Sequence, residues 1–328
     1  MTVEPPSGGR SRSGILRNIG CLATPDVGAT GLRVLRRAAL VWRDGRIEWV
    51  GEEAALPDGL GLAEAGYAEH DASDALVIPG LVDCHTHLAF GGWRADEFVE
   101  RLKGTSYLEI ARAGGGIART VRQTRAASPS ELFDQAAADL VALRALGVTT
   151  VECKSGYGLS YEHELELLEV YRALASSQPT RIVPTLLAAH VVPAEHARDR
   201  DGYLRMVIER LIPEVARRGL ARFCDVFVED GAFSVEEARA VLRAGLGAGL
   251  APKLHVDQLG DGGGASLAAE VQAASADHLE HVSERGIADL AEAGVVAVSL
   301  PIASAVLAQP MMPARRLLEA GVPVAVAT

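Results

Sequence analysis

Two histidines lie one residue apart in the stretch PGLVDCHTHLAFGG, which covers residues 79–92. The apolar run before them is typical of a buried strand, whose side chains alternate between the two faces of a sheet. We therefore expect His85 and His87 to point the same way, with Asp83 on the same face. Two neighbouring imidazoles on one rigid surface can bind a single metal ion. His255 in KLHVDQ is the natural third ligand, so the sequence predicts a metal site with an open position for water.

Other residues near these runs either do chemistry or have an ordinary structural role. His278 in SADHLEH either lies beside the metal site or is a core histidine whose hydrogen bonds are satisfied within the protein. Arg94, shortly after the histidine pair, is a solvated arginine or a bidentate contact for a carboxylate. Tyr157 in KSGYG fills the core or offers its hydroxyl to a ligand. The glycine clusters at 114–116 and 260–264 lack the spacing of a phosphate-binding loop, so we interpret them as loops near the site.

Eight short apolar runs supply the elements that position these residues. They cover 75–83, 148–154, 181–190, 224–229, 251–256, 275–281, 295–300 and 322–328. Amphipathic helical patterns lie between them, for example at 128–147, capped by Ser128, and at 234–249. The alternation predicts an α/β fold, a (β/α)8 TIM-like barrel, with a doubly wound sheet as the alternative. Catalytic side chains of such barrels lie at the C-terminal ends of strands, as do His85, His87, His190, His255 and His278.

The sequence before the first barrel strand does not alternate between strand and helix patterns. We expect residues 1–14 to form a disordered arm, residues 15–75 a small β-rich domain and residues 76–328 the barrel. Within the small domain, Asp44 and Gly45 supply a tight turn for a hairpin over 32–51.

The composition limits the partners and the compartment. A formal net charge of −11 argues against nucleic acid or an anionic membrane as partner, and leaves a small-molecule substrate. The uncharged stretch 293–314 contains three prolines, so we interpret it as a strand and a loop rather than a membrane span. Four scattered cysteines without a CxxC pair indicate a reducing, cytoplasmic setting. Dimers are the commonest soluble assembly, so a homodimer is the oligomer to test.

Several longer strings resemble a known family. VIPGLVDCHTHL is similar to the opening of the amidohydrolase superfamily, which are metal-dependent hydrolases on a distorted (β/α)8 barrel. In this order, HTHLAFGGWRADEF, GTSYLEIARAGGGI, TTVECKSGYGL, HVDQL and SADHLEH resemble the imidazolonepropionase family within it. The similarity runs from about residue 75 to the last residue. It implies hydrolysis of 4-imidazolone-5-propanoate to N-formimidoyl-L-glutamate, a step of histidine degradation, with one divalent metal, Zn or Fe.

The resemblance also implies roles for single residues. The positions that match the family's metal ligands are His85, His87 and His255. The positions that match its substrate contacts are Arg94, Tyr157, His190 and Gln258, and a catalytic histidine close to the attacked carbonyl matches His278. Gln258 stands where some members carry glutamate, so it offers hydrogen bonds to the ring but no acid or base.

One departure from the family pattern concerns the end of the sequence. The family's fourth metal ligand is an aspartate that would follow Thr328, and the last barrel helix and the C-terminal β strands are missing as well. We therefore expect the functional form to be longer and the 328-residue chain to be nearly inactive. An assay of ring opening with and without the added segment tests this expectation. Two alternatives stay open, another amidohydrolase of the base deaminase type and an inactive truncated remnant.

Overall fold

The computed structural model describes residues 13–26, 31–60, 67–105, 109–110 and 113–328. The chain divides into two compact units, Met1–Gly80 and Leu81–Thr328. The arm expected at residues 1–14 lies outside the described residues up to residue 12, and the first strand begins at Gly14.

The first unit is a five-stranded mixed sheet. Its strands are β1 (Gly14–Pro25), β2 (Leu32–Arg43), β3 (Arg46–Glu52), β4 (Ala68–Asp71) and β5 (Leu76–Val77), with 3-10 turns at Glu53–Ala55 and Asp58–Leu60. The strand order is β3-β2-β1-β4, and β5 also pairs with β1. The predicted hairpin is confirmed as β2 and β3, and its turn residues Asp44 and Gly45 have φ angles of 51° and 76°. Positive φ at both positions matches the right-handed twist of the flanking strands.

The second unit contains eight strands paired in sequence order, and every neighbouring pair is parallel. They are β6 (Leu81–Thr86), β7 (Val148–Lys154), β8 (Arg181–Ala189), β9 (Phe223–Val228), β10 (Ala251–Val256), β11 (Ser275–His278), β12 (Val296–Ser299) and β13 (Val324–Val326). Just after β13, the Thr328 hydroxyl donates to the Asp83 carboxylate of β6 over 2.7 Å. The last strand therefore lies next to the first. The predicted (β/α)8 barrel is confirmed, and the doubly wound alternative is wrong because its strand order would not be consecutive.

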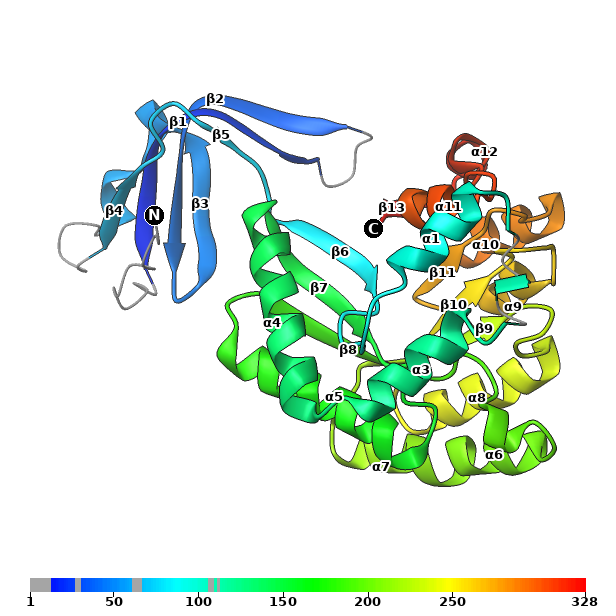
Figure 1. Cartoon of the computed structure of the whole chain (residues 1–328). Helices are drawn as coiled ribbons and strands as arrows, with labels where there is room; N and C mark the ends of the chain where they lie inside the picture. Colours follow the sequence, from blue (N-terminus) through cyan, green and yellow to red (C-terminus); the bar gives the residue numbers. More distant parts are fainter. Residues whose placement is uncertain (1–12, 27–30, 61–66, 106–108, 111–112) are drawn as a thin grey trace. The chain divides into compact units, whose positions relative to one another are not determined.

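Helices surround these strands on the outside (Figure 1). They are α1 (Ala95–Leu102), α3 (Gly116–Ala126), α4 (Pro129–Ala145), α5 (Tyr161–Ser177), α6 (Arg200–Met206), α7 (Ile212–Arg217), α8 (Val235–Gly247), α9 (Gly264–Glu270), α10 (Glu284–Ala293), α11 (Pro301–Leu307) and α12 (Ala314–Glu319). A 3-10 turn covers Ala194–His196, and a π turn over Val207–Leu211 joins α6 to α7. Both helices that we predicted begin with a capping box, Ser128 with Glu131 in α4 and Ser234 with Glu237 in α8. Each box satisfies backbone N–H groups that the first helical turn leaves free.

Strand β7 shows how the barrel separates its apolar and polar residues. Val151 and Cys153 belong to the buried apolar core that the strands share with the helices. Glu152 and Lys154 alternate with them and are equally buried, and Lys154 forms an ion pair with Asp225 of β9 inside the barrel. Strand alternation therefore gives the barrel an apolar outside, covered by helices, and a charged inside.

Two strand predictions are wrong in their extent. The strand expected at 75–83 is two strands, because β5 belongs to the first unit and β6 to the barrel. Pro79 lies in the break, and proline has no N–H for a strand ladder. The strand expected at 275–281 ends at His278, because His278 and Leu279 have positive φ angles of 84° and 64° that leave the extended conformation.

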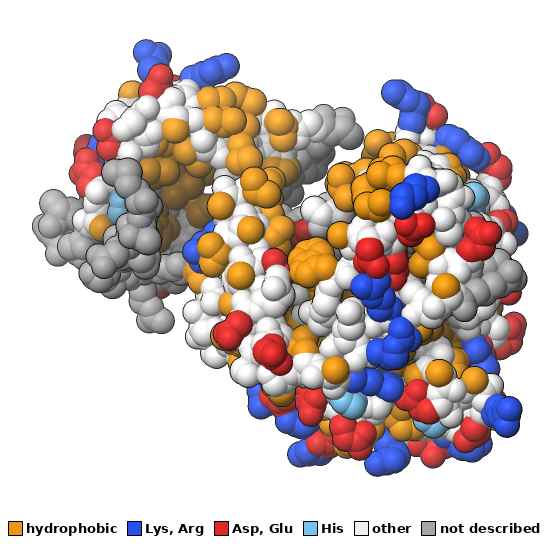
Figure 2. All heavy atoms as spheres, in the orientation of Figure 1, with side chains coloured by type: hydrophobic (Ala, Val, Ile, Leu, Met, Phe, Trp, Pro, Cys, Tyr) orange, Lys and Arg blue, Asp and Glu red, His pale blue; other side chains and the backbone are white. Residues whose placement is uncertain are grey.

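The surface of the barrel unit carries charges of both signs. Acidic and basic side chains are interspersed over the face shown in Figure 2. Among the helices in the described part of the chain, none combines the length and the apolar character that crossing a bilayer requires.

Candidate metal centre and active site

A cavity of about 900 Å³ opens at the C-terminal ends of the barrel strands. Its size lies in the range typical of small-molecule sites. Every residue predicted from the sequence to act in the site lines it: His85, His87, Arg94, Tyr157, His190, His255, Gln258 and His278. Five different strands or the loops after them contribute these residues, so the barrel brings together side chains that are far apart in the sequence.

Five imidazoles pack against one another in this cavity. The ring centroids of His85 and His255 are 4.5 Å apart, and each of them lies within 5.6 Å of the ring of His87. His278 lies 5.4 Å from His85 and 5.5 Å from His255. His190 stacks on His87 with 5.1 Å between centroids. A group of imidazoles this dense is a candidate metal centre.

Buried aspartates orient two of these rings. The Nδ1 atom of His85 lies 2.7 Å from the Asp277 carboxylate, and the Nδ1 atom of His255 lies 3.1 Å from that of Asp225. A carboxylate that accepts a hydrogen bond from Nδ1 fixes the tautomer of the ring. The lone pair of Nε2 is then free to bind a metal. Both rings therefore present Nε2 to the cavity, and this carboxylate–imidazole pairing is typical of metal-binding histidines.

The distances between the imidazoles fit one metal ion. The Nε2 atoms of His87 and His255 are 3.4 Å apart. Two nitrogens bound to one tetrahedral ion at about 2.1 Å would lie about 3.4 Å apart. The Nδ1 atom of His87 is buried and has no hydrogen bond partner in the part of the chain that the structure describes. No hydrogen bond at Nδ1 therefore competes with an orientation of the ring in which Nε2 faces the cavity. The residues present therefore fit a divalent metal.

The protonation states of the rings also fit. Burial lowers the pKa of His85 and of His87 well below the usual value, with the charge of Lys154 and the other imidazoles adding to the effect. Burial likewise lowers the pKa of His255 and brings that of His190 to about 3. These imidazoles are neutral near pH 7, and only a neutral imidazole can bind a metal.

A second grouping is also compatible with an ion. One ligand atom each from His85, His255 and His278 lies within 4.8 Å of the others. His278 differs from the other two because its Nδ1 is 3.5 Å from Glu280 and its backbone φ is 84°. A non-glycine residue at positive φ is strained, and such strain is concentrated at functional sites. The backbone thus holds the His278 ring against the imidazole cluster at a cost in energy.

Lys154 lies beneath the cluster and is fully buried. Its ammonium nitrogen is 3.0 Å from Glu152, 2.6 Å from Asp225 and 3.3 Å from Asp277. Burial alone would lower the pKa of Lys154, but the three carboxylates outweigh it and raise this pKa above the usual value. Lys154 is therefore a permanent cation that balances the two aspartates holding His85 and His255.

Tyr157 and His190 form one wall of the cavity. The Tyr157 ring lies 5.1 Å from that of His87 and 5.4 Å from that of His190. The Nδ1 atom of His190 is 3.0 Å from the Gly156 carbonyl, which leaves its Nε2 for a ligand. The buried carboxylate of Glu164 in α5 accepts backbone hydrogen bonds from 156, 158 and 159, so it fixes the loop that carries Tyr157.

Arg94 and Gln258 reach the cavity from other sides. Arg94 precedes α1, is one-third exposed and lies 3.5 Å from the carboxylate of Glu97. Gln258 follows β10, and its backbone N–H donates to the buried carboxylate of Glu229 over 3.1 Å. The N–H of Leu259 donates to the same oxygen over 2.8 Å. Glu229 thereby ties the loop after β10 to the end of β9.

Sequence reasoning missed the roles of Asp225, Asp277 and Arg101. The two aspartates hold the rings of His85 and His255, and Arg101 lines the cavity from α1. A single acidic residue inside a short apolar strand, such as Asp225 in CDVFVE, was a usable signal because a buried charge needs a partner. The sequence signal for Arg101 was weaker. It consisted of its position seven residues after Arg94, which places both arginines on the same side of a helix.

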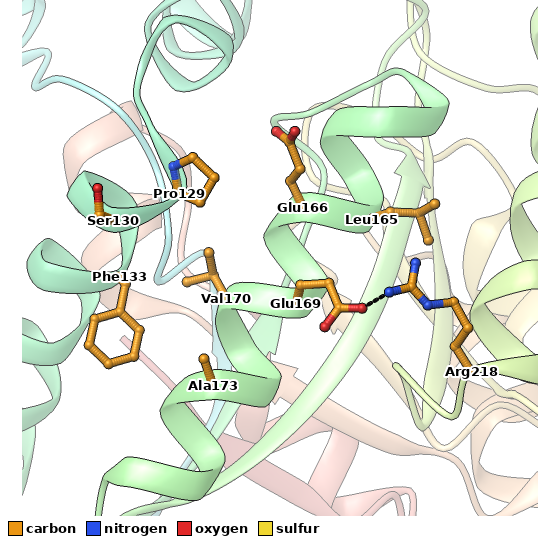
Figure 3. A pocket seen from close by; sticks show the side chains of 9 residues that line it. All are labelled: Pro129, Ser130, Phe133, Leu165, Glu166, Glu169, Val170, Ala173 and Arg218. Atoms are coloured by element: carbon orange, nitrogen blue, oxygen red, sulfur yellow. Dashed lines mark hydrogen bonds and ion pairs between the residues drawn. The ribbon is translucent and has the colours of Figure 1, made fainter.

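A second hollow lies on the outside of the barrel, between α4 and α5 (Figure 3). It measures about 410 Å³ and is lined largely by apolar side chains such as Phe133 and Val170. Glu169 forms an ion pair with Arg218 at its edge. The imidazole cluster lies elsewhere, so we place the chemistry in the cavity at the barrel mouth.

Comparison with known proteins gives close sequence relatives. The imidazolonepropionase of Myxococcus xanthus (strain DK1622) is 51% identical over 287 residues, which are 87% of this chain and 68% of the relative. That of Anaeromyxobacter dehalogenans (strain 2CP-C) is 50% identical over 317 residues, 96% of this chain and 74% of the relative. That of Cupriavidus necator is 48% identical and matches 100% of this chain and 77% of the relative. No family model matches the chain.

Solved structures share the fold at low sequence identity. Guanine deaminase from C. acetobutylicum with bound guanine superposes with a TM-score of 0.65 and 18% identity, covering 96% of this chain and 74% of that one. A triazine hydrolase superposes with a TM-score of 0.70 and 16% identity, covering 97% and 72%. These structural similarities show a shared fold only. Sequence identity of about 50% over most of the chain, in contrast, identifies the family. The chain belongs to the imidazolonepropionase family.

Proposed function

We propose that this protein hydrolyses 4-imidazolone-5-propanoate to N-formimidoyl-L-glutamate in histidine degradation. One observation carries the proposal: a cluster of neutral imidazoles held by buried aspartates lines the cavity of a chain about half identical to imidazolonepropionases. The reaction adds water across the ring C–N bond, so that the carbonyl carbon gains the hydroxyl and the ring nitrogen gains the proton.

The metal in this proposal is one divalent ion, Zn or Fe, held by His85, His87 and His255. Imidazole nitrogen suits both metals, and the donor set leaves an open position. When bound, the ion would supply a Lewis acid that polarises the ring carbonyl and activates water. The residues around it then have the tasks of binding the substrate, orienting it and handling the proton.

Each of the remaining site residues has one of these tasks. Arg94 binds the propanoate, because its guanidinium matches a carboxylate. Tyr157 and His190 orient the ring from one wall, and Gln258 offers a further hydrogen bond. His278 lines the cavity beside His85 and His255, where an N–H of its ring can donate a hydrogen bond to the oxyanion that develops on the attacked carbonyl.

The test is an assay of the metal-supplemented, full-length gene product on 4-imidazolone-5-propanoate. We expect a product heavier by one water, identified as N-formimidoyl-L-glutamate by mass spectrometry, and loss of turnover after chelation with recovery on adding Zn or Fe. Ammonia release from guanine, with no hydrolysis of the imidazolone, would instead support a base deaminase. Absence of stoichiometric metal after supplementation would support a non-catalytic remnant.

Arg94→Ala is expected to raise KM for 4-imidazolone-5-propanoate by about 10- to 100-fold and to leave kcat less affected. The physical reason is the loss of a charge-assisted contact to the propanoate, worth about 1.5–3 kcal/mol. Arg122→Ala is the matched control, because the Arg122 side chain is exposed and donates to the Gly114 carbonyl outside the cavity. An unchanged KM in the Arg94 variant would refute the propanoate assignment.

The setting proposed for this enzyme is the cytoplasm, with a homodimer as the assembly to test. All four cysteines are free, and burial raises the pKa of Cys153 and Cys224. Buried thiols of this kind suit a reducing compartment. Light scattering of the purified chain measures the assembly directly.

A further inference from the structure

Helix α1 has its charged side turned inward. Its less exposed positions are Arg94, Glu97 and Arg101, whereas Phe98 and Val99 are 41% and 47% exposed. A surface helix ordinarily presents apolar residues at such spacing to the interior. Residues seven apart differ by only about 20° around a helix and by about 10 Å along it. Helix α1 therefore lays two guanidinium groups, those of Arg94 and Arg101, along the wall of the cavity.

The charged side chains of Arg94, Glu97 and Arg101 differ in how fully their hydrogen-bonding atoms are used. The Glu97 carboxylate accepts the Gly116 N–H over 3.1 Å and lies 3.5 Å from both Arg94 and Arg119. Arg101 donates from Nη2 to the Leu307 carbonyl at the end of α11. Its Nε and Nη1 atoms are buried and have no hydrogen bond partner among the residues that the structure describes. Buried donor atoms of a charged guanidinium are costly to leave unused unless an anion binds to them.

We propose that Arg101 is a second carboxylate-binding residue of the cavity, which holds the propanoate of the substrate together with Arg94. The proposal rests on the function proposed above, because that substrate has one carboxylate at the end of a flexible chain. Arginine suits such a group because its planar, always charged fork matches a carboxylate. The bond to the Leu307 carbonyl holds the guanidinium in place before the ligand arrives, which lowers the entropy cost of binding.

The test compares two probes on the full-length, zinc-supplemented chain. One is 3-(imidazol-4-yl)propanoate, and the other is 4-ethylimidazole, which keeps the ring but lacks the carboxylate. Calorimetry of Arg101→Gln is expected to show binding of the propanoate weakened by about 10- to 100-fold, with binding of ethylimidazole unchanged. Arg101→Lys keeps the charge without the planar fork, so we expect a loss of propanoate affinity between those of the wild type and Arg101→Gln. If Arg101→Gln does not fold, this variant still tests the proposal.

Arg239→Gln in α8 is the matched control. Arg239 pairs with Glu270 and does not line the cavity, so both probes are expected to bind its variant as they bind the wild type. Equal weakening of both probes by Arg101→Gln would mean that Arg101 only ties α1 to α11, and no weakening would mean that it does not touch the carboxylate. Either result overturns the proposal, as does a wild type without preference for the propanoate.

Turnover separates this inference from the proposed function. In steady-state kinetics with 4-imidazolone-5-propanoate, Arg101→Gln is expected to raise KM with little change in kcat, because the contact is present in both ground and transition state. A wild type that prefers the propanoate probe but turns over no imidazolone would refute the proposed function and leave the carboxylate site standing. Normal turnover with an unchanged KM in the variant would refute the role of Arg101 alone.

Discussion

His255→Ala is expected to remove the bound metal and to lower kcat/KM for 4-imidazolone-5-propanoate by at least about 1,000-fold. Lewis-acid assistance is worth several kcal/mol of barrier, and each 1.36 kcal/mol corresponds to about tenfold in rate. The variant also leaves the Asp225 carboxylate, which lies 3.1 Å from Nδ1 of the native ring, without that partner. Elemental analysis after dialysis and steady-state kinetics measure the two effects.

His163→Ala is the control for a histidine of ordinary structural role. His163 lies in the first turn of α5, and its Nδ1 is 2.8 Å from the Ser160 hydroxyl. It does not line the cavity, so metal content and kcat/KM should match the wild type. Retention of stoichiometric metal by the His255 variant would contradict the assignment of His255 as a ligand.

Lys154→Met is expected to lower the free energy of unfolding by about 3–5 kcal/mol, because it removes the cation that lies closest to three buried carboxylates. Lys154 is fully buried and is shared by Glu152, Asp225 and Asp277. Its interactions help to keep the pKa of each aspartate below the usual value, against the opposite effect of burial. Thermal and urea unfolding followed by circular dichroism measure the loss. We also expect metal affinity to fall by about 10- to 100-fold, since the two aspartates orient His85 and His255, the ligands proposed above.

The matched control is Lys103→Met, which removes the same charge at the surface. Lys103 pairs with Glu100 over 2.8 Å, and its side chain is 63% exposed. Exposed ion pairs contribute little to stability, so this variant should unfold as the wild type does. Equal stability of the two variants would show that the buried carboxylates need no cation, against the account given for Lys154.

The hairpin and the helix starts could be read from the sequence because their signals are local. Asp44 and Gly45 adopt the positive φ angles that the turn requires, and the Ser128 box begins α4 where the pattern predicted it. The division of the run at 75–83 was harder, because Leu76 and Val77 are as apolar as the barrel strand after them. Pairing with β1 rather than with β7 assigns them to the first unit, and pairing is a non-local property.

The pattern of the sequence predicted the barrel, and it predicted residues that all line the cavity. Periodicity gives strands and helices, and parallel strands bring their C-terminal ends to one face, so histidines at strand ends had to approach one another. The groups that orient these histidines depend on the tertiary fold. Strand register places His255 opposite Asp277 and Phe227, and packing sets α1 beside the end of α11 with Arg101 between them. Hydrogen bonds and ion pairs act over a few ångströms between residues far apart in the chain, so the partners of His85, Lys154 and Arg101 follow from register and packing rather than from local pattern.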